Sequence, residues 1–344
     1  MEQSANFTPI SSDAKKTRQS NMELLRIISM IMVLIVHLDG ASLGLPELKG
    51  NLSSLDSRAA WRLIVEAFAI VGVNCFTLIS GYFGIRLRWK SIGIFLFECV
   101  FYSVGIYSLL CLTGLKEFDF LKWLESWMVL THTDLWYIPA YFCLMLLSPF
   151  INAGFRIMTR SRAAFLTIAL AVFNIWGGWL WKGSFNPTGY TFMQLILMYC
   201  IGRCIALYNR REKKSLVCRC LLAGAYVILS LITALYSCWN PVKAFAYNSP
   251  GVLLASIALF LLFRNLQFHS RGINYFAQSA FAVYLLHKSP LLWGDYEKPA
   301  IVNLWKSTTL VEFSISAIGI VIGVYLATIV IDAVRRKISN KIFR

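Results

Sequence analysis

The sequence has few acidic residues and no Cys-x-x-Cys pair, and both features help to exclude classes of protein. It contains 17 aspartates and glutamates against 33 lysines and arginines. Its nine cysteines fall almost entirely in apolar stretches, which disfavours a disulfide scaffold and a thiolate metal site. It also has no polar stretch beyond about 20 residues, the length of one membrane-spanning helix. We therefore expect no second, soluble domain and no metal.

What the chain does have is apolar sequence. Of its 344 residues 58% are hydrophobic and only 15% are charged, with a mean hydropathy of +0.62. This is well beyond the usual composition of soluble domains and indicates a multi-pass membrane protein. The net charge is +16, and the number of Lys and Arg residues alternates between high and low in successive loops. This pattern is typical of the positive-inside rule and disfavours nucleic-acid binding.

The hydropathy pattern predicts an all-α, polytopic bundle of about ten transmembrane helices, with both termini cytoplasmic. An even number of spans places every Lys/Arg-rich loop on the inner side, whereas one span more or fewer would invert all later loops. The predicted spans centre on residues 24–42, 61–81, 92–113, 134–153, 163–181, 190–208, 217–238, 250–267, 276–293 and 311–333.

The two ends of the chain are polar. Residues 1–21 are expected to form a disordered cytoplasmic tail, and no small-x-small cleavage pattern follows the first apolar run, so that run is expected to be retained. Residues 22–334 form the predicted membrane domain. The basic segment 335–344 is expected to be a second cytoplasmic tail.

The first predicted span contains an ionisable pair. His37 follows Arg26 by eleven residues, so both lie on one stripe of the helix, roughly 16 Å apart along its axis. Intramembrane ionisable groups are usually functional, and a histidine that titrates near neutral pH is the commonest general base. The alternatives are that Arg26 anchors the helix at the interface and that His37 is a hydrogen-bonded interior residue.

Two further groups are predicted at the depth of His37. Glu66 lies near the outer end of the second span and His287 in the outer half of the ninth. A carboxylate that holds one nitrogen of an imidazole while the other takes a proton is a common general-base arrangement. Alternatively, Glu66 pairs with Arg62 one turn earlier, and His287 forms an ordinary hydrogen bond between helices.

The inner end of the second predicted span carries an arginine pair. Arg86 and Arg88 follow Ser80 and Gly81 closely. Two guanidinium groups at this spacing can each bind phosphate oxygens in a bidentate manner, and a helix end with Gly and Ser lets another chain approach closely. The alternative is ordinary positive-inside charge, for which lysine would serve equally well.

Three features together resemble the acyltransferase-3 family of bacterial integral-membrane acyltransferases, over essentially the whole chain. They are Arg26-x10-His37, the pattern Gly-Val-x-x-Phe-x-x-x-Ser-Gly from residue 72 to 81 with its arginine pair, and Ser279-x4-Tyr284-x2-His287. The resemblance implies a ten-helix core. It also implies a bacterial inner-membrane location.

The resemblance further implies that His37 is catalytic, and Glu66 and His287, predicted at the same depth, are its candidate partners. Arg86 and Arg88, with Arg26, would bind the donor acetyl-CoA or another acyl-CoA, and Ser80, Gly81 and Tyr284 would be structural or line the cavity. The chain is similar to stand-alone O-acetyltransferases, which modify surface polysaccharides, glycolipids or their lipid-linked precursors. No bound cofactor is implied.

Some residues depart from the family or stay unassigned. Asn74 and Thr77 stand where many members have an acidic residue and a second aromatic. Glu98 is intramembrane, but no motif gives it a role. His132 and His269 lie in loops predicted on opposite sides of the membrane, so they cannot share one metal ion.

The alternative function is a proton-coupled transporter or flippase of an amphiphile or anion, in which intramembrane His37, Glu66, Glu98 and His287 relay protons. Carriers of this kind often contain inverted repeats and paired, Gly-interrupted helices. The sequence has no convincing internal repeat.

Overall fold

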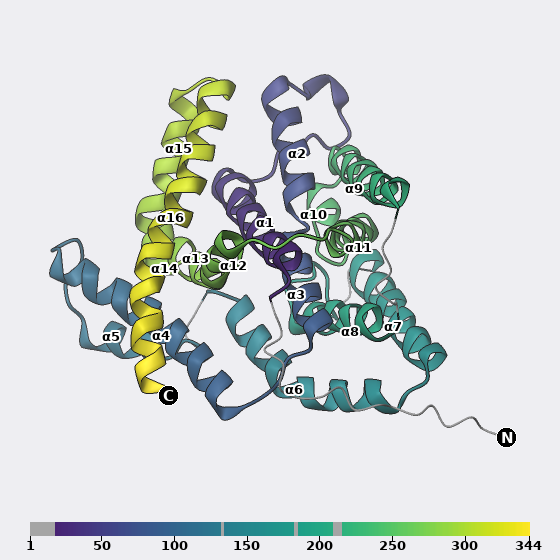
Figure 1. The fold of residues 1–344 in the computed structure, drawn as a ribbon. Helices are drawn as coiled ribbons and strands as arrows, with labels where there is room; N and C mark the ends of the chain where they lie inside the picture. The colour runs from purple at the N-terminus through teal and green to yellow at the C-terminus, as the bar shows by residue number, and fades with distance from the viewer. Residues whose placement is uncertain (1–17, 132–133, 182–184, 209–214) are drawn as a thin grey trace.

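The computed structural model describes residues 18–344 except 132–133, 182–184 and 209–214, and over these residues the chain is helical without a β-strand. The predicted all-α class is confirmed. Figure 1 shows α1 and α3 in the middle of the molecule, with α16 alongside α15 on one flank and α7 and α8 on the other. The N-terminal tail expected over residues 1–21 falls mostly outside the described residues, and α1 already begins at Ser20.

The helices are irregular in length, and several are joined end to end. The longer α-helices are α1 (Ser20–Val36), α2 (Ser57–Ala69), α3 (Gly72–Phe83), α4 (Trp89–Leu112), α6 (Tyr137–Ile157), α7 (Arg160–Asn174), α8 (Phe192–Tyr208), α9 (Leu216–Ser237), α11 (Pro250–Arg264), α15 (Lys298–Ser307) and α16 (Leu310–Ile342). The shorter α-helices are α5 (Phe120–Trp127), α10 (Pro241–Ala244), α12 (Arg271–Phe276), α13 (Ala280–His287) and α14 (Pro290–Leu292). The remaining turns are the π-helices η1 (His37–Ala41), η3 (Ile175–Leu180) and η5 (Trp293–Glu297) and the 3₁₀ turns η2 (Leu52–Ser54) and η4 (Ala277–Ser279).

Seven helical stretches of the described chain are long and apolar enough to cross a membrane. They are α1 with η1, α2 with α3, α4, α6, α7 with η3, α9, and α16. α8 and α11 are also apolar but have only 17 and 15 residues, below the usual length of a spanning helix. The chain is a multi-pass membrane protein, while the count of ten spans stays a prediction.

The expected span at residues 276–293 is broken into short pieces. α13 ends at His287, and Ser289 has ψ 124° in front of Pro290, which begins α14. Proline favours extended backbone at the residue before it and cannot continue a helix. The break therefore places His287 at a helix end rather than in the middle of a span.

The last helix is longer than expected. α16 continues to Ile342 through the segment that we expected to be a basic tail. Arg335 lies on its inward face and is only 4% exposed. The charged C-terminal residues therefore belong partly to the folded domain.

The centre of the bundle depends on close contacts of α3. A Cβ on Gly72 would lie 2.6 Å from the Ser29 carbonyl oxygen of α1, and a Cβ on Gly81 would clash with the backbone of Tyr199 in α8. Only glycine permits these approaches. α3 thereby holds α1, and with it His37, at a fixed position.

Candidate active site

His37 lies where α1 changes into the π-helix η1. Its Nδ1 is 2.7 Å from Nε2 of His287, and the two ring centroids are 5.0 Å apart. The residues are 250 positions apart in sequence, and α1 contacts α13 directly. The structure thus brings together two of the three residues considered for catalysis.

The hydrogen bonds fix the tautomers of a neutral pair. Nδ1 of His287 is 2.5 Å from the carbonyl oxygen of Val283, which can only accept, so this nitrogen carries the hydrogen. Nε2 of His287 is then the acceptor and His37 donates from Nδ1. The lone pair on Nε2 of His37 is left free to take a proton, as a general base requires.

Aromatic rings surround His37 on the remaining sides. Trp293 presents an edge at 5.9 Å between centroids, and Tyr284 lies at 6.4 Å. The ammonium of Lys288, next in the chain to His287, stands 3.7 Å from the centre of the Trp293 ring, a cation–π contact. Glu297 interacts electrostatically with Lys288. Burial raises the pKa of the Glu297 carboxyl to about 7, although the positive charge of Lys288 opposes this rise.

Glu66 stands at the same level but does not take either expected partner. Arg62 forms its ion pair with Asp39 and also donates to the Gly44 carbonyl. A Cβ on Gly40 would lie 2.8 Å from Oε1 of Glu66, so the carboxyl touches the backbone of η1. Oε2 of Glu66 is buried and has no hydrogen-bond partner among the described residues.

Three cavities share walls along the axis of α1. The first, which we call the acceptor-side cavity, has a volume of about 320 Å³ and includes His37, Glu66, Trp136, Tyr190 and Lys288 in its wall. The second, the neck, has only about 30 Å³. It shares His37, Trp136 and Tyr284 with the first cavity. His37 therefore borders both.

The third, the basic cavity, has a volume of about 360 Å³ and shares Phe76 and Phe281 with the neck. Four arginines contribute to its wall: Arg18, Arg26, Arg335 and Arg336. Arg26 pairs with Glu23 at 2.7 Å and keeps 27% of its side chain exposed. A polar chamber with four guanidinium groups is suited to phosphate.

The basic cavity is held by a buried charge network. Asp332 of α16 pairs with Arg335 at 2.7 Å and with Arg336 at 3.1 Å, and it accepts a hydrogen bond of 2.8 Å from Ser279. Glu98 lies 3.4 Å from Arg335. Glu98, which no motif explained, thus helps to neutralise an arginine of this wall.

The C-terminal end of α3 carries Ser80 and Gly81, predicted to be structural or to line the cavity, and the predicted donor-binding residues Arg86 and Arg88 follow it. Ser80 contributes to the wall of the basic cavity and lies 3.2 Å from the hydroxyl of Tyr141. Gly81 is the close contact with α8. Arg86 and Arg88 are exposed, in the segment between α3 and α4, and do not contribute to the wall of the basic cavity.

The two departures from the family pattern have different surroundings. Asn74 is fully buried; it donates to the Tyr247 carbonyl at 2.9 Å and accepts from Gln194 at 2.9 Å. Thr77 donates to the Val73 carbonyl at 3.1 Å. Asn74 therefore fixes the backbone of Tyr247, a residue in the wall of the neck.

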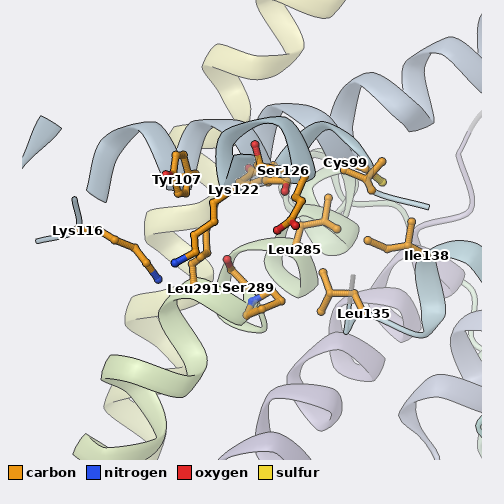
Figure 2. Close-up of a pocket in the computed structure, with 15 residues that line it drawn as sticks. Cys99, Tyr107, Lys116, Lys122, Ser126, Leu135, Ile138, Leu285, Ser289 and Leu291 are labelled. Atoms are coloured by element: carbon orange, nitrogen blue, oxygen red, sulfur yellow. The ribbon is translucent and has the colours of Figure 1, made fainter. Parts of the chain in front are cut away.

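A further cavity of about 300 Å³ lies between α4, α5 and the α13–α14 junction (Figure 2). Figure 2 shows Lys116, Lys122 and Ser289 around it together with the apolar side chains of Leu135 and Ile138. Among the described residues no histidine contributes to its wall. It is therefore not the cavity that contains the base.

Sequence reasoning did not find several of these residues. Arg335 and Arg336 were counted only as part of the expected basic tail 335–344, and Trp136 was not singled out. The aspartate at position 332, within one turn of both arginines, is a local signal for a buried cluster. Among the described residues no group of three or more His, Cys, Asp or Glu side chains is placed to hold a metal ion.

Comparison with known proteins assigns the chain to a family. Residues 19–331 match the family model described as an acyltransferase domain, that of the acyltransferase-3 family. Comparisons with curated proteins and with solved structures gave no match. Because the match covers far more than half of the chain, the protein belongs to the acyltransferase-3 family of membrane acyltransferases.

Proposed function

We propose that the protein is an O-acyltransferase that moves an acyl group, acetyl in the first place, from acyl-CoA to a hydroxyl of a cell-surface polysaccharide, a glycolipid or a lipid-linked precursor. The observation that carries this proposal is the position of His37. It borders a polar cavity on one side and, through a narrow neck, an arginine-rich cavity on the other.

The basic cavity is suited to the nucleotide end of the donor. CoA carries several phosphates, and Arg26 and Arg336 offer guanidinium groups that bind phosphate in a bidentate manner. The apolar rings of Phe76 and Phe281 then line the way toward His37, as a pantetheine arm requires. Arg86 and Arg88 would attract the donor from the same side.

The acceptor-side cavity is suited to a sugar. About 320 Å³ lies within the range of small-molecule sites. Trp136 and Tyr190, 5.2 Å apart, offer an aromatic wall, and Glu66 and Thr188 offer hydrogen-bonding groups. This mixture of aromatic surface and polar groups can bind the apolar faces and the hydroxyls of a pyranose.

The reaction follows from the tautomers. Nε2 of His37 takes the proton of the acceptor hydroxyl as the oxygen attacks the thioester carbon, forming the C–O bond and moving the carbonyl π electrons onto oxygen. The tetrahedral intermediate then breaks its C–S bond, and the proton on Nε2 passes to the leaving sulfur. His287 stabilises the transient imidazolium through the 2.7 Å hydrogen bond.

The orientation that we propose follows the positive-inside rule. The basic cavity would face the cytoplasm, where acyl-CoA is made, and the acceptor-side cavity would face outward. Ten spans with both termini cytoplasmic, in the inner membrane of a bacterium, fit the charge pattern of the loops.

The direct test uses purified protein in nanodiscs with labelled acetyl-CoA and glycan extracted from cells that lack the gene. His37→Ala should lower CoA release and label transfer at least about a hundredfold, because a placed base contributes about 10² to 10⁴ in rate. His269→Ala, at an exposed histidine outside the three cavities, is the matched control. Wild-type transfer by His37→Ala would refute His37 as the base. With the protein in sealed proteoliposomes, uptake of label without CoA release would favour a carrier.

A further inference from the structure

Tyr137, at the start of α6, has a buried hydroxyl that lacks a well-formed hydrogen bond within the described residues. The residue is 6% exposed, and its hydroxyl has no hydrogen-bond partner among the described residues. The Thr77 hydroxyl interacts with it, but Thr77 donates its own hydrogen to the Val73 carbonyl at 3.1 Å and can therefore offer Tyr137 only an acceptor. Buried polar groups are nearly always paired, because an unpaired one costs free energy.

The surroundings of Tyr137 show where a partner would enter. Its side chain contributes to the wall of the neck, the same small cavity that His37 and Tyr284 line. The ring is fixed by three aromatic neighbours: Tyr141 at 5.5 Å, Tyr284 at 6.0 Å and Phe76 at 6.3 Å between centroids. The hydroxyl is therefore held on a rigid support beside the path to the base.

We propose that the Tyr137 hydroxyl donates a hydrogen bond to the thioester carbonyl oxygen of the acyl donor and stabilises the oxyanion that forms on it. This inference rests on the proposed function. The chemistry requires such a donor, because attack on the carbonyl moves a full negative charge onto oxygen in a site largely closed to water. An unpaired, immobile donor needs no reorganisation when this charge develops.

Tyr141 provides a matched control within the same helix. It lies one turn further along α6 and stacks on Tyr137, but its hydroxyl already lies 3.2 Å from the Ser80 hydroxyl. Removing the Tyr141 hydroxyl breaks a 3.2 Å contact, whereas removing the Tyr137 hydroxyl loses only its weaker interaction with Thr77. A structural role and a role in catalysis therefore predict opposite results for the two Tyr→Phe variants.

The first measurement compares kinetics and stability in nanodiscs with acetyl-CoA as the donor. Tyr137→Phe should lower kcat about a hundredfold or more, the usual loss for one oxyanion donor, with little change in donor KM and with a melting temperature equal to or above that of the wild type. Tyr141 lines the basic cavity and not the neck, so Tyr141→Phe should keep kcat within a few fold, and any effect should fall on donor KM. If Tyr137→Phe keeps wild-type kcat while His37→Ala is inactive, this inference fails and the proposed function stands.

The second measurement does not depend on turnover. The infrared band of [1-¹³C]acetyl-CoA is recorded on His37→Ala protein, which binds the donor without transferring it. A hydrogen bond from Tyr137 lowers the carbonyl frequency, so adding Tyr137→Phe should move the band back up, and adding Tyr141→Phe should not. An unchanged band overturns the inference, and the absence of any bound band overturns the donor assignment with it.

Discussion

The contact between His37 and His287 makes a quantitative prediction about catalysis. When His37 takes the proton of the acceptor, its Nδ1–H becomes a charged donor toward Nε2 of His287, 2.7 Å away. A hydrogen bond to a charged group contributes roughly 1.5–3 kcal/mol, which corresponds to about 10- to 150-fold in rate. We therefore expect His287→Ala to lower kcat by about this factor, less than His37→Ala does.

His287→Gln distinguishes two ways in which His287 can act. Its side-chain amide oxygen can accept the hydrogen from His37 at a similar reach, but it cannot take up a proton. If His287 only orients His37 and stabilises its charge, as the tautomers indicate, Gln should recover most of the activity that Ala loses. If a proton has to pass on to His287, Gln and Ala should be equally slow.

The assay is label transfer from acetyl-CoA at saturating donor, with folding checked by the elution profile and melting temperature of each variant. His269→Ala again serves as the control histidine. Wild-type kcat in both His287→Ala and His287→Gln would show that the 2.7 Å contact has no part in catalysis, and the tautomer argument would then be refuted.

Three further predictions concern charge. Arg26→Gln should raise the KM for acetyl-CoA about tenfold or more with little change in kcat, because one charge-assisted contact to phosphate is lost. Arg88→Lys keeps the charge but removes the bidentate guanidinium group, so it should also raise the KM for acetyl-CoA. Unaltered donor kinetics in either variant would remove that residue from the donor site. Glu297, with its pKa raised to about 7, should reduce stability as pH rises from about 4.5 to 7, since the unfolded chain ionises first, by on the order of 2–3 kcal/mol. Glu297→Gln should therefore raise the melting temperature at pH 8 relative to the wild type and not at pH 4, and equal shifts at both pH values would contradict this assignment.

The sequence predicted the helical class and singled out His37 because both depend on local patterns. A long apolar run predicts a membrane helix, and an ionisable residue within one is conspicuous at any position. The same reasoning selected His287, but it could not choose between Glu66 and His287 as the partner of His37. That choice depends on how α13 meets α1, a contact between residues 250 positions apart.

The arginines of the basic cavity could not be found in the same way. The positive-inside rule counts charges beyond the end of a span, and it assigned Arg335 and Arg336 to a tail. α16 instead continues past the apolar run and places both beside Asp332. A rule based on local charge does not register that a helix extends beyond its hydrophobic segment, where ion pairs within the helix and the tertiary pair of Arg335 with Glu98 stabilise the extension.

Both histidines stand where regular helix ends, and this placement is itself an argument for function. α1 widens into a π-helix at His37, and α13 stops at His287 before Pro290. Lipid cannot form hydrogen bonds with the backbone groups that such irregularities expose, so irregular backbone persists at membrane depth only within protein or beside a polar cavity. In addition, π-turns occur often at functional sites. Here the two irregular ends meet beside the acceptor-side cavity. Regular helix thus ends at the place where the proposed reaction needs a free imidazole nitrogen.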